Sequence, residues 1–338
     1  MDIFNRSITT LNINSDIKAK LLKLSICNIN DLKYFTPTKL AEEINIPVIL
    51  AESIFEQINY DNIKPISGLE LYTNELKKIN SIQTFCKALD NMLEGVTVNG
   101  IPLGKITEFC GPPGIGKTQL GIQLSVNVQI PKMCKGIEGK AIFIDTEGSF
   151  MIERVIQIAN STVDYIKENY PNYKNDSFNL NSILSNIQYF RVHDFQEQIA
   201  LINILENYII SDSMIKVIVI DSIAFHFRQT FSSMSLRTQI LNNIAQILMK
   251  IADKYNIAIV IMNQMTMKFQ RMKEDPANKE ESLLVPALGE SWGHASTNRF
   301  ILSTTDDQMI RKIFLQKSPN NKQGIAYYQI TNDGVRDV

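Results

Sequence analysis

The sequence predicts an α/β protein in which a mostly parallel central sheet is preceded by a small all-helical domain. Two observations carry this prediction. Beyond residue 83, short apolar segments of strand length alternate with amphipathic helical segments, which is typical of a parallel sheet covered by helices on both faces. Before residue 65, apolar residues recur at spacings of three and four, which indicates helices. The length of 338 residues suits two unequal domains.

The helical pattern runs from Asn12 to Tyr60, with turn-like interruptions. Lys64–Gly68 ends it, and a polar stretch rich in lysine and asparagine follows as far as Ile82. We therefore expect a helical domain over residues 1–64, a linker over 65–82 and an α/β domain over 83–338. The apolar residues at helical spacing are Ile17, Leu21, Leu24, Leu40, Ile44, Ile49, Ile54 and Ile58.

Five apolar segments in the α/β domain have the length of buried strands. Each is separated from the next by a stretch with helical periodicity, so neighbouring strands are expected to run parallel. The expected strands are Ile106–Cys110, Ala141–Asp145, Ile187–Val192, Val217–Asp221 and Ile257–Met262.

Composition excludes several classes of protein. With 44% hydrophobic and 20% charged residues, global disorder is excluded. A net charge of −1 means that any nucleic-acid site must be a local patch. The four cysteines are far apart, which favours reduced thiols of an intracellular protein without a zinc or disulfide framework. The N-terminus has no signal-peptide pattern, and no apolar run approaches the ~20 residues that cross a membrane, so no membrane partner is expected.

A complete phosphate-binding motif, G-x-x-x-x-G-K-S/T, follows the first expected strand and precedes a helix. Its glycines allow backbone N–H groups to point at phosphate oxygens, and the helix N-terminus adds a favourable dipole. Lys117 is expected to contact the β- and γ-phosphates and Thr118 to ligate Mg²⁺. The motif therefore predicts ATP and Mg as cofactors. Its residues are Gly111, Pro112, Pro113, Gly114, Ile115, Gly116, Lys117 and Thr118.

Two acidic residues stand at expected strand ends. Asp221 ends a buried strand and suits the aspartate that holds Mg²⁺ in such ATPases, although an aspartate there can also cap the next helix. Glu147 follows another strand and can deprotonate a water for attack on the γ-phosphate. The alternative for Glu147 is a solvated loop carboxylate. The sequence leaves both alternatives open.

Gln264 ends a further apolar strand, so its amide is expected at the same edge of the sheet as the phosphates. A neutral amide there can sense the γ-phosphate and transmit its loss to the following loop. The alternative is an amide that hydrogen-bonds turn backbone.

Together these residues resemble the RecA/RadA-type DNA recombinase family over roughly residues 80–338. The resemblance rests on the phosphate loop, Phe143–Phe150, Ile220–Ser222, Asn263–Gln264 and Gly293–Thr297. Within the family, Val128–Pro131 and Leu284–His294 are most similar to the eukaryotic paralogue C group. The resemblance implies a RecA-like P-loop ATPase core, ATP bound at a face closed by a neighbouring subunit, and nuclear action in homologous recombination and DNA repair.

The resemblance also implies residue roles. Gln119 joins the nucleotide-binding set, and Arg154 matches an arginine that stacks on adenine, with a helix-surface salt bridge as the alternative. His294 matches a histidine that closes the second DNA-facing loop. The two DNA-facing loops map to Phe227–Thr238 and Met265–Trp292.

The first of these loops carries Arg228 and Arg237 without an acidic residue, and Phe231 lies between them. This composition suits contact with single-stranded DNA. The second loop cancels its own charge, so a solvated insertion is a competing interpretation. Its charged residues are Lys268, Arg271, Lys273, Lys279, Glu274, Asp275, Glu280 and Glu281.

The strand-exchange members of the family carry a Phe-x-x-Ala motif in the linker that docks on the next subunit, whereas Gly68–Tyr72 lacks it. The Phe-x-x-Ala at Phe85–Ala88 runs into a helical pattern and is interpreted as packing. We therefore expect a Mg-dependent ATPase, stimulated by DNA and weak when isolated, in a heteromeric complex with other recombinase paralogues. It would assist the main strand-exchange recombinase on single-stranded or branched DNA. The alternative is a non-catalytic adaptor ordered by ATP; a small-molecule kinase would need a basic lid that the sequence does not show.

Overall fold

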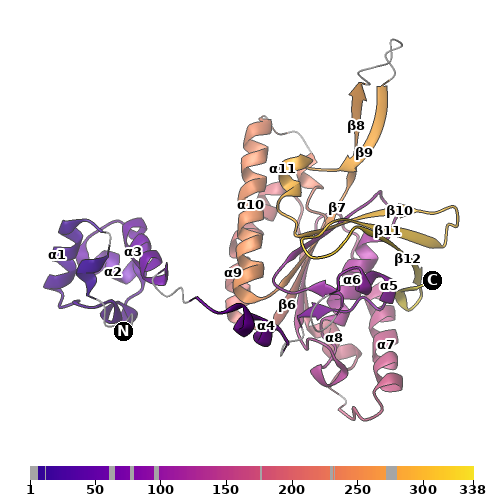
Figure 1. Cartoon of the computed structure of the whole chain (residues 1–338), viewed down its shortest axis with the longest axis horizontal. Helices are drawn as coiled ribbons and strands as arrows, with labels where there is room; N and C mark the ends of the chain where they lie inside the picture. The colour runs from indigo at the N-terminus through magenta and orange to yellow at the C-terminus, as the bar shows by residue number, and fades with distance from the viewer. Residues whose placement is uncertain are drawn as a thin grey trace. The chain divides into compact units, whose positions relative to one another are not determined.

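The computed structural model describes residues 7–11, 13–60, 65–76, 80–94, 99–175, 177–228, 231, 233–271 and 280–338. The chain divides into two compact units, Met1–Thr73 and Asn74–Val338 (Figure 1). Their boundary falls inside the expected linker, which carries helix α4 (Gly68–Leu76) and strand β1 (Ser81–Ile82). The division into 1–64, 65–82 and 83–338 stays a prediction.

The smaller unit is helical. Its elements are η2 (Ile8–Thr10), α1 (Ser15–Lys23), η3 (Ile29–Tyr34), α2 (Pro37–Ile44) and α3 (Val48–Tyr60). The side chain of Thr36 accepts the Lys39 N–H at the start of α2, where Pro37 occupies the first turn. The helices bury an apolar cluster made of Ile8, Leu11, Leu21, Ile26, Ile29, Leu32, Leu40, Ile44 and Ile54. Leu24 and Ile49 share the helical spacing but are exposed.

A nine-stranded sheet forms the centre of the larger unit, in the order β13-β12-β11-β10-β3-β7-β6-β4-β5. Strands β10, β3, β7, β6, β4 and β5 are parallel, and β11, β12 and β13 extend the sheet as antiparallel strands. All five expected strands are confirmed as β3 (Ile106–Cys110), β4 (Lys140–Asp145), β5 (Ile187–Arg191), β6 (Ile215–Asp221) and β7 (Ala258–Asn263). The remaining four are β10 (Asn298–Thr304), β11 (Ile310–Lys317), β12 (Gly324–Thr331) and β13 (Gly334–Asp337).

Helices cover both faces of this sheet, as the fold class requires (Figure 1). In β6, Val217 and Val219 belong to the core on one face, and Ile218 and Ile220 to the core on the other. This alternation follows from the two-residue period of a strand. The first core is covered by α5 (Lys87–Asn91), α6 (Lys117–Asn127), α7 (Ile152–Asn169) and α8 (Leu180–Ser185), the second by α9 (Phe195–Ser211), α10 (Met234–Tyr255) and α11 (Gly289–Gly293).

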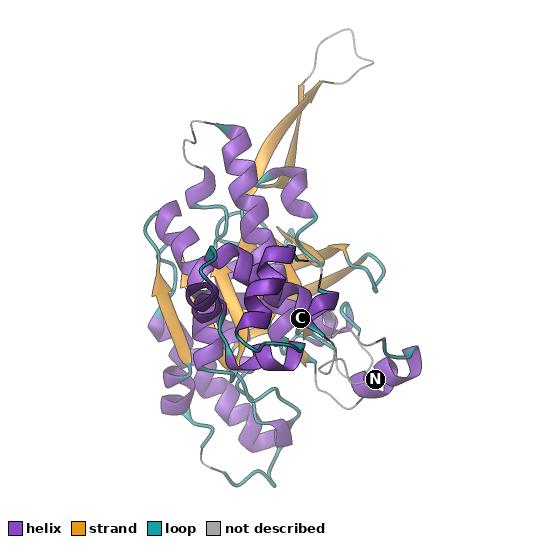
Figure 2. Cartoon of the chain, turned by 90° about the vertical axis from the view of Figure 1, so that its left-hand side faces the viewer, coloured by secondary structure: helices purple, strands orange, loops and turns teal. Residues whose placement is uncertain are grey.

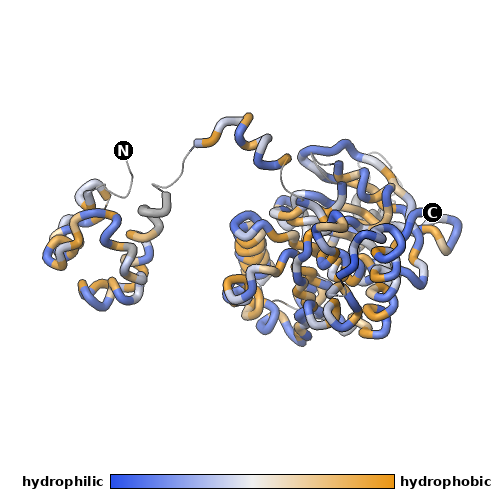
Figure 3. Tube along the Cα trace, turned by 90° about the horizontal axis from the view of Figure 1, so that it is seen from below, coloured by the Kyte–Doolittle hydropathy of each residue, from blue (hydrophilic) through white to orange (hydrophobic). Residues whose placement is uncertain are grey.

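In Figure 3, hydrophobic and hydrophilic residues alternate along the helices, as expected for helices with one buried face. Short 3-10 turns are η4 (Lys132–Cys134) and η5 (His226–Arg228). In the part of the chain that the structure describes, no helix is both long and apolar enough to cross a membrane.

A two-stranded hairpin projects beyond the rest of the larger unit (Figures 1 and 2). Its strands are β8 (Met265–Arg271) and β9 (Glu280–Pro286), paired from Met265↔Pro286 to Arg271↔Glu280. A second, short pair joins β1 to β2 (Ile101–Pro102). The expected DNA-facing loop at 265–292 is thus a hairpin followed by α11. Lys273, Glu274, Asp275 and Lys279 lie outside the described residues.

Candidate active site

The phosphate loop connects β3 to α6, where the sequence motif requires it. Gly114 and Gly116 have φ values of 76° and 104°, in the left-handed region that favours glycine. A Cβ at Gly116 would lie 2.3 Å from Ile330 Cδ1, the tip of a side chain of β12, which would have to move. The loop therefore needs glycine at this position chiefly for its backbone conformation.

Lys117 lies inside the loop with 8% of its surface exposed. Its Nζ donates to the carbonyl oxygens of Gly111 and Pro112, at 2.9 Å each. Burial lowers the pKa of Lys117, and the nearby carboxylates of Asp221 and Glu147 oppose that shift. These bonds place the ammonium group at the centre of the loop, where the motif predicts phosphate.

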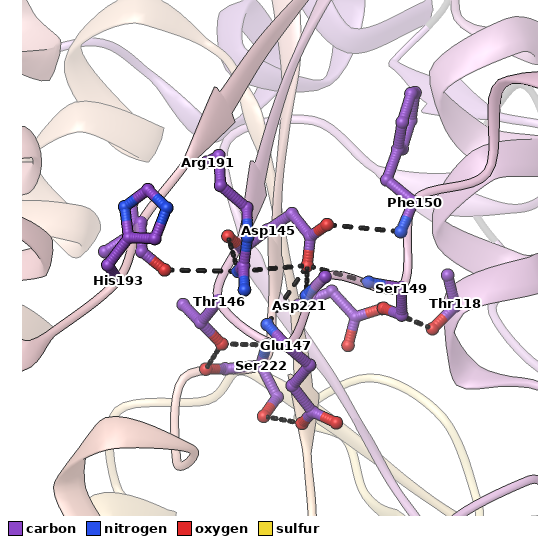
Figure 4. A network of polar contacts seen from close by, with 12 residues as sticks. Thr118, Asp145, Thr146, Glu147, Ser149, Phe150, Arg191, His193, Asp221 and Ser222 are labelled. Atoms are coloured by element: carbon purple, nitrogen blue, oxygen red, sulfur yellow. Dashed lines mark hydrogen bonds and ion pairs between the residues drawn. The ribbon is translucent and has the colours of Figure 1, made fainter.

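Thr118 and Asp221 form the next part of the site. The Thr118 hydroxyl donates to Asp221 Oδ2 at 2.5 Å, and Ser149 Oγ donates to the same oxygen at 3.4 Å (Figure 4). Asp221 is 2% exposed, and burial raises its pKa to about 6 although the Thr118 hydrogen bond lowers it. Asp221 thus faces the phosphate loop instead of capping the next helix. A hydroxyl beside a carboxylate is a ligand pair that suits Mg²⁺.

Glu147 is held by two side-chain donors. Ser222 Oγ donates to its Oε1 at 2.5 Å, and Gln264 Nε2 donates to the same oxygen at 2.6 Å (Figure 4 shows the first contact). Glu147 is exposed but fixed in orientation, unlike a freely solvated loop carboxylate. Gln264 in turn accepts from Arg228 Nη1, so among the described residues its amide hydrogen-bonds side chains and not turn backbone. The structure therefore brings Glu147, Gln264 and Arg228 together.

The loop that carries Glu147 is itself anchored by Asp145, which the sequence reasoning missed. Asp145 is fully buried, and its Oδ1 accepts the N–H groups of Glu147, Gly148 and Ser149 at 3.1, 2.7 and 3.2 Å. Its Oδ2 accepts from Phe150 N and Tyr189 OH, both at 3.1 Å. An aspartate followed at once by a glycine-containing turn is the signal that could have found it, because such side chains hydrogen-bond the backbone that follows.

Arg154 is engaged by the end of the sheet and by α6. Its Nε donates to Gln119 Oε1 at 2.6 Å, and its two terminal nitrogens donate to the carbonyl oxygens of Asn332 and Thr331 at 2.7 and 2.5 Å. Among the described residues, Arg154 does not form the helix-surface salt bridge that was the alternative. The guanidinium plane is thus held beside the helix that begins at Lys117, and adenine stacking stays a prediction.

The side chains of the first DNA-facing loop differ in how accessible they are to a ligand. Arg228 is exposed, whereas Arg237 turns back and its Nε donates to the Phe227 carbonyl oxygen at 2.7 Å. The ring of Phe231 packs on Phe195 and Phe227, at centroid distances of 5.0 and 5.8 Å. This packing holds Phe231 against the core, which argues against its use as a stacking platform for bases. His294 is exposed just after α11.

The fold and this site define a RecA-like P-loop ATPase core. The sequence profile of the Rad51 family matches residues 75–338. The chain is 36% identical to "DNA repair protein RAD51 homolog 3" of Cricetulus griseus, with 98% of this chain and 92% of that protein aligned. It is 41% identical to the protein of the same name from Dictyostelium discoideum, with 86% and 74% aligned.

It is also 31% identical to "DNA repair and recombination protein RadA" of Aeropyrum pernix, with 94% of this chain and 92% of that protein aligned. The chain therefore belongs to the Rad51 family, and the resemblance stated from its motifs is confirmed. The similarity to RAD51 homolog 3 also confirms the paralogue subgroup that Leu284–His294 indicated.

Proposed function

We propose that this protein is a Mg-dependent ATPase of homologous recombination and DNA repair, a recombinase paralogue that acts in the nucleus. The observation that carries the proposal is the Thr118–Asp221 pair beside Lys117, with Glu147 held by Ser222 and Gln264. ATP would be bound by Gly111–Thr118, with Gln119 and Arg154 on the side of the base. Among the described residues, no group of three or more His, Cys, Asp or Glu side chains could hold a metal alone, which suits an ion that arrives with nucleotide phosphates.

The chemistry assigned to each side chain follows from its position. Mg²⁺, ligated by Thr118 and Asp221, would neutralise charge on the phosphates. Glu147 would accept the proton of the attacking water, because its carboxylate is already oriented by two donors. Gln264 touches Glu147, so it can report the presence of the γ-phosphate to the hairpin β8–β9, which begins at the next residue.

We propose that the assembly is heteromeric, with other recombinase paralogues as partners and with a role in assisting the main strand-exchange recombinase. Turnover would be weak in the isolated chain, because a site completed by a neighbour lacks part of its transition-state electrostatics. The names of the similar proteins support the role in DNA repair. Phe85 is half-buried and packs on Tyr165, at 4.6 Å between ring centroids, which supports the interpretation of Phe85–Ala88 as packing and not as a docking motif.

The second candidate is a non-catalytic adaptor in which ATP only orders an interface. The orientation of Glu147 by Ser222 and Gln264 favours the enzyme, because an adaptor has no use for a positioned base. ATP turnover of the complex isolated with its partners, compared between the wild-type chain and Glu147→Gln and measured with and without Mg²⁺ and single-stranded DNA, separates the two. Turnover that requires Mg²⁺, rises with DNA and is lost in Glu147→Gln supports the enzyme. Nucleotide that stays unhydrolysed in that complex would establish the adaptor.

Assembly provides a prediction of its own. The chain alone is expected to form no long helical filaments on DNA, since Gly68–Tyr72 lacks the docking phenylalanine and alanine. Electron micrographs of the protein with ATP and single-stranded DNA provide the measurement. Regular filaments of this chain alone would contradict the heteromeric assembly.

Salt dependence tests the DNA contact. Replacing Arg228 with alanine is expected to flatten the slope of log K against log salt by about 0.7, because one phosphate contact to single-stranded DNA is lost. Arg237→Ala is the matched control and should change the slope less, since Arg237 is half-buried and donates its Nε to Phe227, whereas Arg228 is exposed, although its Nη1 donates to Gln264. Binding isotherms of the assembled complex with ATP at several salt concentrations give both slopes. An unaltered slope for Arg228→Ala would move the contact to another loop or subunit.

A further inference from the structure

A buried carboxylate outside the residues discussed so far lies close to the phosphate loop. Glu108 is in β3, three residues before Gly111, and is fully buried. Its Oε1 accepts from Asn263 Nδ2 at 2.7 Å and from Trp292 Nε1 at 3.1 Å. Its Oε2 accepts from Arg299 Nε at 2.7 Å, and Arg299 Nη2 lies 2.7 Å from the same oxygen. A buried carboxylate without donors is costly, and here donors come from three separate elements.

The first donor, Asn263, connects Glu108 to the active site. Asn263 is the last residue of β7, and its carbonyl oxygen accepts the Gly111 N–H at 3.2 Å. The next residue, Gln264, donates to Glu147. Asn263 Nδ2 also donates to the Ala287 carbonyl oxygen at 3.0 Å, just beyond β9. Glu108 therefore holds a residue whose side chain bonds the base of the hairpin, whose backbone carbonyl bonds the start of the phosphate loop, and which directly precedes Gln264.

The other two donors fix the segment that follows the hairpin. Trp292 lies in α11, and the chain reaches Arg299 of β10 a few residues later. A Cβ at Gly293 would lie 2.9 Å from Arg299 Nη1, so this position accepts no larger residue without moving the arginine. Lys317 Nζ donates to the carbonyl oxygens of Gly293 and Ser296, at 2.9 and 2.6 Å. Helix α11 is therefore held by Trp292, which donates to Glu108, and at its last residue by Lys317.

We propose that Glu108 is a positioning residue for ATP hydrolysis, acting through Asn263 and Trp292 and not on the reacting atoms. It holds the ends of β3 and β7 and the base of the β8–β9 hairpin in one arrangement, in which Gln264 meets Glu147. This inference rests on the proposed ATPase function. Nucleotide entering the phosphate loop would alter contacts at Gly111 and hence, through Asn263, the surroundings of the carboxylate that Trp292 touches.

Trp292 provides a direct readout, because it is the single tryptophan of the chain and is 2% exposed. Adding Mg-ATP to the full chain is expected to change its fluorescence in a saturable way, with a midpoint equal to the ATP dissociation constant from calorimetry. Lys117→Ala should move both midpoints together. Flat fluorescence during a measured heat of binding would overturn this inference alone. The absence of any heat would overturn the proposed function and this inference with it.

Steady-state kinetics of the partner-bound complex provide the second test. Glu108→Gln is expected to lower kcat by about tenfold or more, since small displacements of reacting groups are costly, while KM for ATP changes by less than about twofold. Trp292→Phe removes one hydrogen-bond donor to Glu108 and keeps an aromatic ring in the core. It is expected to lower kcat with the same small change in KM, and it provides the test if Glu108→Gln does not fold.

Phe300→Leu is the matched control, since Phe300 is buried next to Arg299 but packs on Phe109. It should lower Tm and leave kcat unchanged. Normal turnover in both Glu108→Gln and Trp292→Phe would overturn the proposal. So would a loss of kcat in Phe300→Leu proportional to its loss of Tm, because the role would then be general stability.

Discussion

Replacing Glu147 with glutamine is expected to lower ATP turnover of the partner-bound complex by about 10²-fold or more. Glutamine keeps an Oε1 that can accept from Ser222 and Gln264, as the carboxylate does now at 2.5 and 2.6 Å. It cannot accept the proton of the attacking water. The substitution therefore removes the chemistry while the hydrogen-bonded arrangement of the site is kept, and ATP should still bind.

Two measurements on the same preparation separate binding from chemistry. Calorimetric titration is expected to give the wild-type affinity for ATP, and a phosphate-release assay the loss of turnover. Glu153→Gln is the matched control, because Glu153 is an exposed carboxylate in the first turn of α7 whose side chain makes no hydrogen bond or ion pair to the described site residues. If Glu147→Gln and Glu153→Gln hydrolyse ATP equally fast, Glu147 is not the base.

The sequence was most informative where local pattern alone decides structure. The phosphate loop needs glycines at fixed positions, because Gly114 and Gly116 adopt left-handed backbone conformations. A sequence motif with glycines at those positions therefore predicts the loop directly. Four of the five expected strands, β3, β4, β6 and β7, are buried almost throughout, so they appear as mostly apolar runs; the edge strand β5 is only partly buried. The common position of Asp221, Glu147 and Gln264 could then be predicted, because the carboxyl ends of parallel strands meet at one edge of the sheet.

The last four strands of the sheet escaped the sequence reasoning for the opposite reason. In β12, Ala326 and Tyr328 are buried while Ile325 and Tyr327 are exposed. Strands of this kind mix polar and apolar residues, and their pairing with β11 is set by contacts between segments and not by local pattern. The hairpin β8–β9 was expected only as a loop, because its two strands need each other to form.

The supporting residues of the site were missed because their partners are distant in sequence. Glu108 stands in a segment that reads as an apolar strand, and nothing near it predicts Asn263, Trp292 and Arg299 as donors. Arg237 shows the same limit. Its charge suggested DNA contact, and nothing in the sequence predicted that its Nε donates to the Phe227 carbonyl oxygen; contact between Arg237 and DNA stays a prediction. Charge and spacing predict which residues gather at an edge but not which of them already have partners.

Replacing Lys117 with alanine is expected to weaken ATP binding by about 1.5 to 3 kcal/mol, the range for hydrogen bonds to a charged group, or about 10- to 150-fold in Kd. Lys117 is 8% exposed, and among the described residues its ammonium group donates only to the two carbonyl oxygens of Gly111 and Pro112. Phosphate oxygens would provide stronger, charged acceptors, so the loss should appear in binding.

The fold should survive this change, because alanine removes a desolvated charge whose pKa burial already lowers and leaves the glycines of the loop in place. Thermal unfolding verifies this before calorimetric titration with Mg-ATP. Lys132→Ala, at an exposed lysine in η4, is the matched control and is expected to bind ATP as the wild type does. A folded Lys117→Ala protein with wild-type affinity would exclude contact between Lys117 and the phosphates, and the assignment of Gly111–Thr118 as the nucleotide site would lose its charged anchor.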